Sequence, residues 1–458
     1  MRPPRPLSRA AAVTAGATAL TAAALFLPPV TGAAGAAAAA PPVRPRPAVT
    51  GHRLVSGAGS PLTIAQCQDK WGINCYTPQQ YRQAYDLDPL YRAGITGKGR
   101  TIVIVDSYGS PTIQHDLDVY SAQFGIPSTQ VQIVRWGDVP PFDATDPDQS
   151  GWAGESSLDV EMAHAVAPDA HLVLVETGVA ETEGVTGLPE MMDAEKSLID
   201  RGIGDVISQS FGATENTFPG FEHGDFAALQ QLRYAFEDAA RHGVTVLGSS
   251  GDSGATDAIA DGSVNYPYAV NSWPSADPLV VSVGGTQLHL DEAGNRTAPD
   301  SVYHDYGASG GGTSQVFARP SYQNGVKDVV GERRGTPDIS MSAAVDGGAW
   351  VYSSYDPREV GWNVYGGTSE SSPLFSGVVA LADQLAGRRL GDLHEALYAL
   401  AADDSRYTGI VDVADGTDNS YDGVPGYTAV KGYDMATGVG TLDATRFAHA
   451  LAAGGWRH

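Results

Sequence analysis

The chain has 458 residues, of which 42% are hydrophobic and 55 are glycine, so there is room for one large domain or two ordinary ones with an extensive core and many turns. Asp and Glu outnumber Lys and Arg by 53 to 28, which gives a net charge of −25 at pH 7. This excess of negative charge argues against nucleic acids and anionic membranes as partners and is compatible with a soluble, secreted protein.

The first forty residues are typical of a secretion signal. Arginines among the first nine residues form a basic start, 10–27 is an uncharged stretch rich in Ala and Leu, and 33–40 offers small residues for cleavage. The apolar stretch is weak for a membrane span, and no later run is long enough for one. We therefore predict a secreted, extracellular protein with no membrane partner, and we exclude residues 1–40 from the fold.

Residues 41–75 are predicted to be a short segment between the signal and the main domain. The segment begins with a Pro- and Arg-rich stretch and contains both cysteines of the chain, Cys67 and Cys75. In a secreted protein such a pair is most simply a local disulfide, and no further cysteine supports a redox or metal role. The segment is too short for an independent domain, so we place the main domain at 76–458.

From residue 76 the sequence alternates between predicted helices and strands. Helices are indicated by apolar residues at helical spacing: 77–87, 112–124, 155–166, 189–200, 226–242, 393–402 and a helix that begins near Ser369. Strands are indicated by short apolar, β-branched runs: 101–105, 171–175, 205–208, 244–247 and 279–283. This alternation predicts an α/β fold with a central, mostly parallel sheet and helices on both faces. Sites in such sheets lie at the carboxyl ends of strands, where Asp106, Ser210 and Asp252 are predicted.

A glycine-rich turn leads into the helix near Ser369. The sequence G-G-T-S-E-S-S-P covers 366–373, so Ser369 is expected where free N–H groups and the helix dipole favour negative charge. That setting suits a serine whose substrate develops an oxyanion. Pro373 is expected in the first turn, where its missing N–H costs little. The simplest interpretation is a Ser/Thr helix cap, and the alternative is a nucleophile, which requires a base.

Two carboxylates are candidates for that base. Glu155 and Asp159 are predicted at the start of the helix 155–166, one turn apart and therefore on one face. They are either a solvated pair stabilised by the helix dipole or, because like charges repel, a pair that shares a proton and acts as base and orienting group. His164 is predicted well inside the same helix, where we interpret it as a packed helix residue.

A second glycine-rich turn, G-S-S-G-D-S-G-A-T-D at 248–257, follows a predicted strand. It places Asp252 between glycines at the carboxyl end of that strand. Asp252 is either a turn aspartate or a carboxylic acid that stays protonated and donates a hydrogen bond to an oxyanion.

The motifs E-x-x-x-D, S-G-D-S-G and G-G-T-S-x-x-x-P, in this order, resemble the sedolisin family of serine-carboxyl peptidases, which has a subtilisin-like fold. The resemblance runs from about residue 76 to the C-terminus. It implies that Ser369 is the nucleophile, Glu155 the general base, Asp159 the residue that orients it, and Asp252 an oxyanion donor together with the backbone N–H of Ser369. We expect an endopeptidase, with a tripeptidyl-peptidase as the open alternative, that is active in acid because Glu155 must be ionised while Asp252 stays protonated. We also expect a monomer and protein or peptide substrates.

The resemblance also assigns substrate-binding and metal-binding residues. S-Q-S-F-G at 208–212 is similar to the family's substrate-lining strand, which with the turn before Asp252 implies a binding set of Ser210, Phe211, Gly212, Ser250 and Gly251. Two Asp-containing segments near the C-terminus, at 412–419 and 430–440, offer the hard oxygen ligands that suit Ca²⁺, although their spacing does not fit an EF-hand loop. The family pattern implies one Ca²⁺ ion held by Asp412, Val413, Val430, Gly432 and Asp434.

Two other interpretations stay open. One is an orthodox subtilisin-type peptidase that uses Asp106, His164 and Ser369. The other is a secreted binding protein without catalytic activity on the same scaffold.

Overall fold

A computed structural model describes residues 52–56, 59–403 and 407–454 of the chain. By internal contacts the chain divides into Met1–Pro41 and Pro42–His458, and the first unit, with the predicted signal segment, lies outside the described residues. Within the described ranges, no helix has the length and apolar character needed to cross a membrane.

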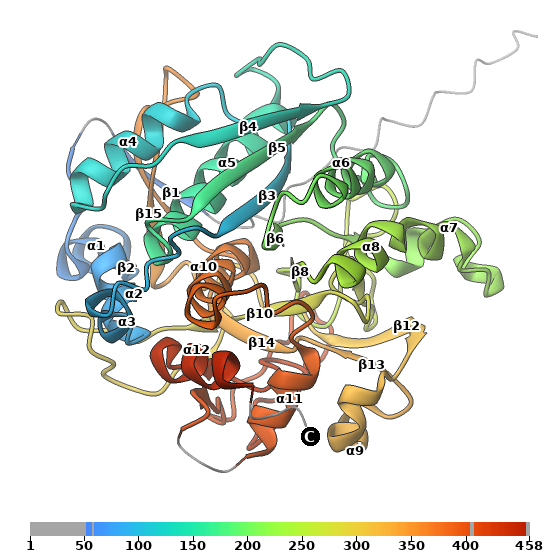
Figure 1. Cartoon of the computed structure of the whole chain (residues 1–458). Coiled ribbons are helices and arrows are strands. Elements are labelled where there is room, and N and C mark those ends of the chain that lie inside the picture. The colour runs from blue at the N-terminus through green and yellow to red at the C-terminus, as the bar shows by residue number, and fades with distance from the viewer. Residues whose placement is uncertain (1–51, 57–58, 404–406, 455–458) are drawn as a thin grey trace, which may run out of the picture. The chain divides into compact units, whose positions relative to one another are not determined.

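An eight-stranded sheet forms the centre of the second unit (Figure 1). Its strands lie in the order β11-β10-β8-β6-β3-β5-β4, and β14 also pairs with β10. All neighbours are parallel except β11, which is antiparallel to β10. The prediction of a mostly parallel sheet is therefore confirmed. The strands are β3 (Thr101–Ser107), β4 (Val131–Trp136), β5 (His171–Thr177), β6 (Val206–Gln209), β8 (Thr245–Ser249), β10 (Val281–Gln287), β11 (Ser301–Val302) and β14 (Ile339–Ser342).

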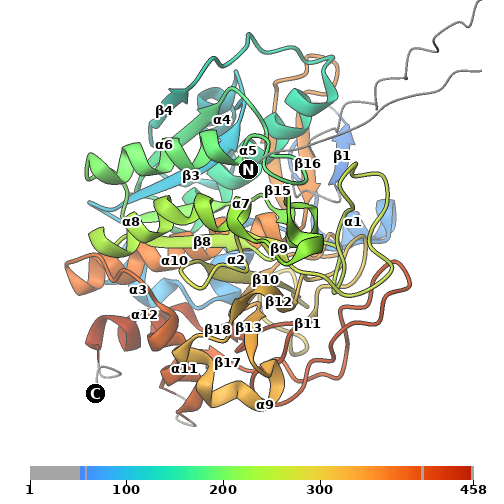
Figure 2. The same cartoon turned by 90° about the vertical axis from the view of Figure 1, so that its right-hand side faces the viewer.

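Helices cover both faces of this sheet, as predicted (Figure 2). The alternation of side chains along a strand explains why. In β3, Ile102 and Ile104 belong to the core that contains most buried apolar residues of α5 (Pro147–Val166) and α10 (Thr368–Ala386). Val103 and Val105 belong to the core beneath α6 (Leu188–Asp200) and α8 (Tyr234–His242). The β-branched run in β3 thus contributes side chains to two cores, one on each face of the sheet.

Besides the helix that carries Glu155, two predicted helices differ from the structure. The helix predicted at 77–87 ends at Ala84, because Asp86 has a φ of 53°, in the left-handed region. The helix predicted at 226–242 is interrupted by a 3₁₀ turn before α8. The remaining helices are α1 (Ile64–Trp71), α2 (Pro78–Ala84), α3 (Asp88–Arg92), α4 (Ile113–Phe124), α7 (Ala227–Gln230), α9 (Lys327–Val330), α11 (His394–Ala402) and α12 (Ala444–Ala453).

A second, four-stranded sheet leads to the helix that carries Ser369. Its order is β1 (His52–Ser56), β16 (Gly361–Tyr365), β15 (Gly348–Ser353) and β2 (Cys75–Tyr76). The predicted disulfide between Cys67 and Cys75 is present and joins α1 to β2. Three two-stranded pairs complete the strands: β7 (Ala213–Thr214) with β9 (Ser272–Trp273), β12 (Gly312–Ala318) with β13 (Arg333–Thr336), and β17 (Ile410–Val411) with β18 (Thr441–Leu442).

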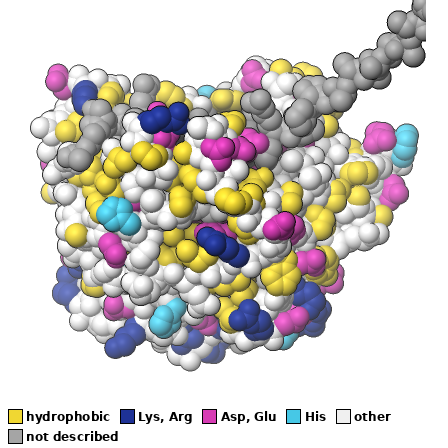
Figure 3. Space-filling view, turned by 90° about the horizontal axis from the view of Figure 1, so that it is seen from above, with side chains coloured by type: hydrophobic (Ala, Val, Ile, Leu, Met, Phe, Trp, Pro, Cys, Tyr) yellow, Lys and Arg dark blue, Asp and Glu magenta, His cyan; other side chains and the backbone are white. Residues whose placement is uncertain are grey.

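On the face shown in Figure 3, Lys and Arg side chains are scattered between acidic, hydrophobic and neutral ones. The described part of this face therefore has no continuous basic patch, and the whole chain has a net charge of −25.

Candidate active site

The turn before α10 places Ser369 at the start of that helix. A Cβ atom on Gly366 would lie 2.5 Å from the backbone oxygen of Ala343, and Gly367 has a φ of 108°, so both positions need glycine. Ser369 is completely buried, and its Oγ makes no hydrogen bond of normal length with any described residue. Its backbone N–H has no backbone acceptor within the described ranges. Among the residues that the structure describes, neither group is therefore occupied by a hydrogen bond of that kind.

Pro373 lies deeper in α10 than the sequence suggested. The prediction of a first-turn proline is wrong, because α10 begins at Thr368 and Pro373 stands inside it. A proline there cannot donate to the carbonyl of Ser369, four residues earlier. The Oγ of Ser210 donates to that oxygen instead, at 3.5 Å. Ser210 thus compensates for the proline and ties the end of β6 to Ser369.

Glu155 and Asp159 lie in the middle of α5. The prediction that this helix begins at Glu155 is wrong, because Asp146 caps it upstream by accepting hydrogen bonds from N–H groups of its first turn. Both carboxyl groups are completely buried, so a solvated pair at a helix start is excluded. Neither carboxyl group forms a hydrogen bond of normal length in the described part of the chain.

Neighbouring groups affect the pKa of each of these carboxyl groups, and for Glu155 they include the Ser369 hydroxyl. Burial raises the pKa of Glu155 well above its usual range, the nearby Asp106 carboxyl raises it further, and the Ser369 hydroxyl lowers it. For Asp159, burial again acts first, then Asp106 and Glu155, while the Ser210 hydroxyl lowers the pKa. Asp106, Glu155 and Asp159 therefore form a buried cluster of acids in which the charge of one group affects the pKa of another.

The sequence predicts Asp106 at the carboxyl end of a strand, and only the orthodox alternative gives it a catalytic role. The structure shows it completely buried near the end of β3. Burial raises its pKa to about 7, and the Ser156 hydroxyl opposes the rise. Its position at the carboxyl end of a predicted strand was the signal that could have assigned it to the site.

Asp252 is hydrogen-bonded to Thr368, the residue that precedes Ser369. Its Oδ1 accepts hydrogen bonds from the backbone N–H of Thr368 at 2.6 Å and from the Thr368 hydroxyl at 3.0 Å. The N–H of Gly251 donates to the same hydroxyl at 3.1 Å. Asp252 also raises the pKa of Glu155, so the structure brings both acids close to Ser369.

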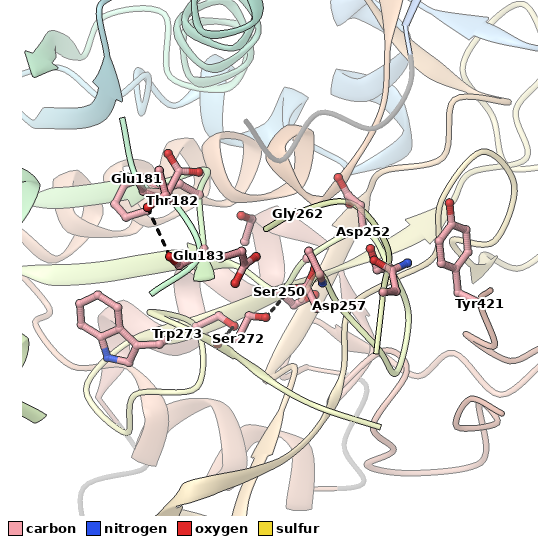
Figure 4. A pocket seen from close by; sticks show the side chains of 18 of the residues that line it. Glu181, Thr182, Glu183, Ser250, Asp252, Asp257, Gly262, Ser272, Trp273 and Tyr421 are labelled. Atoms are coloured by element: carbon pink, nitrogen blue, oxygen red, sulfur yellow. Dashed lines mark hydrogen bonds between the residues drawn. The ribbon is translucent and has the colours of Figure 1, made fainter. Parts of the chain in front are cut away.

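A cavity of about 460 Å³ borders the Asp252 turn (Figure 4). Four of the predicted substrate-binding residues line it, namely Phe211, Gly212, Ser250 and Gly251. Ser210 does not line it, because its side chain points to the Ser369 carbonyl. The wall also contains three carboxyl groups that the sequence analysis did not single out: Glu181, Glu183 and Asp257.

His164 does not belong to this site. It is completely buried, and its Nε2 lies 3.2 Å from the Oγ of Ser121 on α4. Burial lowers the pKa of His164 to about 4. No hydrogen bond joins it to Asp106 or Ser369 in the described residues, so the geometry gives the orthodox triad no support.

The residues predicted to hold Ca²⁺ come from two segments that a hydrogen bond joins. Oδ2 of Asp412 accepts from the N–H of Gly432, and Oδ2 of Asp434 accepts from the N–H of Val430, each at 3.0 Å. The carbonyls of Val413, Val430 and Gly432 accept no hydrogen bond from a described backbone group. Among the described residues no group of three or more His, Cys, Asp or Glu side chains could hold a metal, but carboxylate and carbonyl oxygens are the kinds of ligand that suit Ca²⁺.

The model of the subtilase family matches residues 143–408, more than half of the chain. The chain belongs to the subtilase family. Kumamolisin from Bacillus sp. (strain MN-32) is 30% identical over 388 residues, which cover 82% of this chain and 63% of kumamolisin. Sedolisin from Pseudomonas sp. (strain 101) is 30% identical over 394 residues, which cover 84% of this chain and 62% of sedolisin. This subtilase thus spans slightly less than two thirds of the length of these relatives.

A solved structure supports the same grouping within the subtilases. It is described as Pseudomonas sedolisin, a serine-carboxyl proteinase, complexed with two molecules of pseudo-iodotyrostatin. The match has a TM-score of 0.68 and 27% identity and covers 84% of this chain and 99% of that one. The predicted membership of the sedolisin family and the subtilisin-like fold are confirmed.

Proposed function

We propose that this subtilase is a secreted serine-carboxyl endopeptidase that hydrolyses protein or peptide substrates in acid. The observation that carries the proposal is the placement of Ser369 beside two buried acids. Glu155 is coupled to its hydroxyl, and Asp252 is hydrogen-bonded to Thr368, the residue before it. The names of the relatives, which are peptidases, support the reaction class.

Acylation begins when the Oγ of Ser369 attacks the carbonyl carbon of the scissile bond. The hydroxyl proton passes to the ionised carboxylate of Glu155. The carbonyl oxygen becomes an oxyanion that accepts hydrogen bonds from the N–H of Ser369 and from a protonated Asp252. Because Oδ1 of Asp252 already accepts from Thr368, the proton belongs on Oδ2. When the intermediate collapses, Glu155 gives its proton to the leaving amine and an acyl-enzyme stays on Ser369.

Deacylation repeats these steps with water. Glu155 takes a proton from the water that attacks the ester carbonyl, and the oxyanion again binds to the two donors. Collapse of the intermediate breaks the ester bond, and the proton on Glu155 returns to the Oγ of Ser369. The products are the acid half of the peptide and the free enzyme.

The acid cluster decides which pH suits this cycle. Burial, and then repulsion between neighbouring carboxyl groups, raises the pKa values of Asp106, Glu155 and Asp159, so Glu155 can act as a base only after it has lost its proton. Activity should therefore rise with the ionisation of Glu155 and fall when the Asp252 proton leaves.

The cavity beside Asp252 offers a binding place for a substrate side chain. Large hydrophobic residues are exposed nearby: Tyr306 lines the cavity, and Val264 is flanked by lining residues. Exposed apolar side chains at the rim of a cavity are typical of a surface that binds a peptide.

We also propose one Ca²⁺ ion at the turn of Asp412 and Asp434. The carbonyls of Val413, Val430 and Gly432 would complete its ligands, and the ion would fix the C-terminal loops. Its role is stability, because the turn contributes no residue to the cavity.

Secretion, the monomeric state and the domain limits are proposals as well. Ile64, Cys67 and Cys75 pack into the core that contains β3 and α10, which supports a peptidase domain that starts before residue 76. The disulfide suits an oxidising, extracellular setting.

A covalent serine probe tests the proposal. A peptide aldehyde or fluorophosphonate should bind wild-type protein at Ser369 in acid, and Ser369→Ala should abolish both labelling and peptide hydrolysis while the melting temperature stays within a few degrees. Loss of turnover should reach roughly 10⁴-fold or more, as for other triad nucleophiles. Absence of labelling at every pH would instead favour the binding protein without activity.

A further inference from the structure

Two carboxyl groups from separate segments lie in the wall of the cavity beside Asp252. Glu183 belongs to the loop between β5 and α6, and Asp257 follows the Asp252 turn (Figure 4). Both residues line the cavity and are partly exposed. Burial raises the pKa of Glu183 to about 8, and Asp257 is the next largest cause. We call these two residues the acidic pair.

Fixed hydrogen bonds hold the acidic pair in place. Oε2 of Glu183 accepts from the N–H of Thr214 at 2.9 Å and from the hydroxyl of Thr217 at 3.0 Å. Asp257 accepts from the hydroxyl of Ser272 and from the N–H of Ala258. All of these donors are neutral, so the charge of the acidic pair is not balanced by its own contacts.

The rest of the cavity offers no balancing charge either. No Lys, Arg or His is among the described residues that line it. The other ionisable groups in its wall are acids or phenols: Glu181, Asp252, Tyr306 and Tyr421. Burial raises the pKa of Tyr266, and the nearby Glu183 carboxyl adds to this rise. A positive charge in this cavity would have to come from a ligand.

Unpaired hydroxyls in the same wall point independently to a polar ligand. Ser249 and Ser250 both line the cavity and are each 4% exposed. Neither hydroxyl oxygen has a hydrogen-bond partner in the described part of the chain. Buried hydroxyls normally have partners, so this wall is suited to a side chain that brings hydrogen-bond donors.

We infer that the acidic pair selects substrates with Lys or Arg on the acyl side of the scissile bond. This deepens the proposed function and rests on it. The cavity shares Asp252 and the turn before it with the oxyanion site, so the side chain nearest the reacting carbonyl is the one that enters. Its ammonium or guanidinium group would bind to Glu183 and Asp257 and donate to the serine hydroxyls.

A matched pair of peptides tests this selection. Two fluorogenic peptides differ only in Lys or norleucine at that position, since norleucine keeps the length of the chain and lacks the charge. Wild-type protein should show the higher kcat/KM for Lys, and the preference should grow from pH 4 to pH 7, because a cation must displace a proton that the acidic pair retains in acid.

Substitution of the acidic pair should remove the preference. In Glu183→Gln combined with Asp257→Asn, the Lys-to-norleucine ratio of kcat/KM should fall roughly 10- to 100-fold, the effect of a lost charge-assisted hydrogen bond. Glu222→Gln, which removes an exposed charge away from the cavity, should leave the ratio unchanged. A ratio near one in wild-type protein, or a ratio that the double variant does not alter, overturns the inference.

Binding measurements keep the inference independent of turnover. The two peptides are titrated into Ser369→Ala by calorimetry, and the Lys peptide should bind at least about tenfold tighter. If it binds no tighter, the inference fails even where the peptidase is active. If it binds tighter while wild-type protein hydrolyses neither peptide, the specificity stands and the proposed function fails.

Discussion

In the proposed mechanism, buried acids beside Ser369 take the place that a histidine has in many serine peptidases. His164 cannot replace them, because it is bound to Ser121 and its pKa is lowered by burial. Glu155 alone would be a weak base, but burial and Asp106 raise its pKa. The buried environment therefore supports the proposed role of Glu155 as the base that activates the hydroxyl.

A substitution of Asp106 tests whether its charge affects the pKa of Glu155. Asp106→Asn removes a like charge that raises the pKa of Glu155. The ascending limb of the pH profile of kcat/KM should then move to lower pH by on the order of one unit. Glu332→Gln, at an exposed acid, is the matched control and should not move it. An unchanged limb in Asp106→Asn would show that Asp106 is not coupled to the base.

The sequence predicted the acids at the site more reliably than their surroundings. Ser369, Glu155 and Asp252 could be recognised because each stands in a short motif. The coupling of Asp106 and the acidic pair of the cavity could not, because these contacts join residues far apart in the chain. The compensation of Pro373 by Ser210 likewise depends on packing between β6 and α10.

At the scale of elements, strands of the main sheet were predictable because burial on both faces demands continuous apolar runs. β15 and β16 were not predicted, since they are short, contain glycine, and depend on pairing with each other. The start of α5 was misplaced because its cap, Asp146, precedes a polar first turn rather than an apolar one. Local patterns thus give the framework, while boundaries depend on caps and distant partners.

Removal of Ca²⁺ should destabilise the loops that contain Asp412 and Asp434. Exhaustive chelation should lower the melting temperature by several degrees or more, because an ion that binds only the folded state stabilises it. Ca²⁺ should restore the original value, and equimolar Mg²⁺ should not, since its octahedral demands suit this donor set poorly. An unchanged melting temperature after chelation would contradict the calcium site.

At the scale of the whole molecule, buried carboxyl groups link stability to acid. Burial raises the pKa of several groups outside the site, to about 8 for Glu195 and Glu370 and to about 7 for Asp383. Their folded state binds protons more tightly than the unfolded state. The stabilisation is therefore fully present below the unfolded pKa of about 4 and is lost as pH rises through about 7 to 8.

The free energy of unfolding should accordingly be larger at pH 4.5 than at pH 8. Guanidinium titrations at pH 4.5, 6 and 8, with Ca²⁺ held constant, measure this difference. Glu370→Gln, which removes one such group, should flatten the dependence. Asp338 acts in the opposite direction, because Arg334 and His394 lower its pKa, so its contribution is lost only in stronger acid. Stability that increases from pH 4.5 to pH 8 would contradict this account.

The pH dependence of peptide hydrolysis tests the acid-based mechanism most directly. We would measure kcat/KM from pH 2 to pH 9 for wild-type protein, Glu155→Gln and His164→Gln. The account predicts an optimum in acid, a loss of roughly 10²- to 10⁴-fold in Glu155→Gln, and activity retained in His164→Gln. An optimum above pH 7 that disappears in His164→Gln and survives in Glu155→Gln would contradict it.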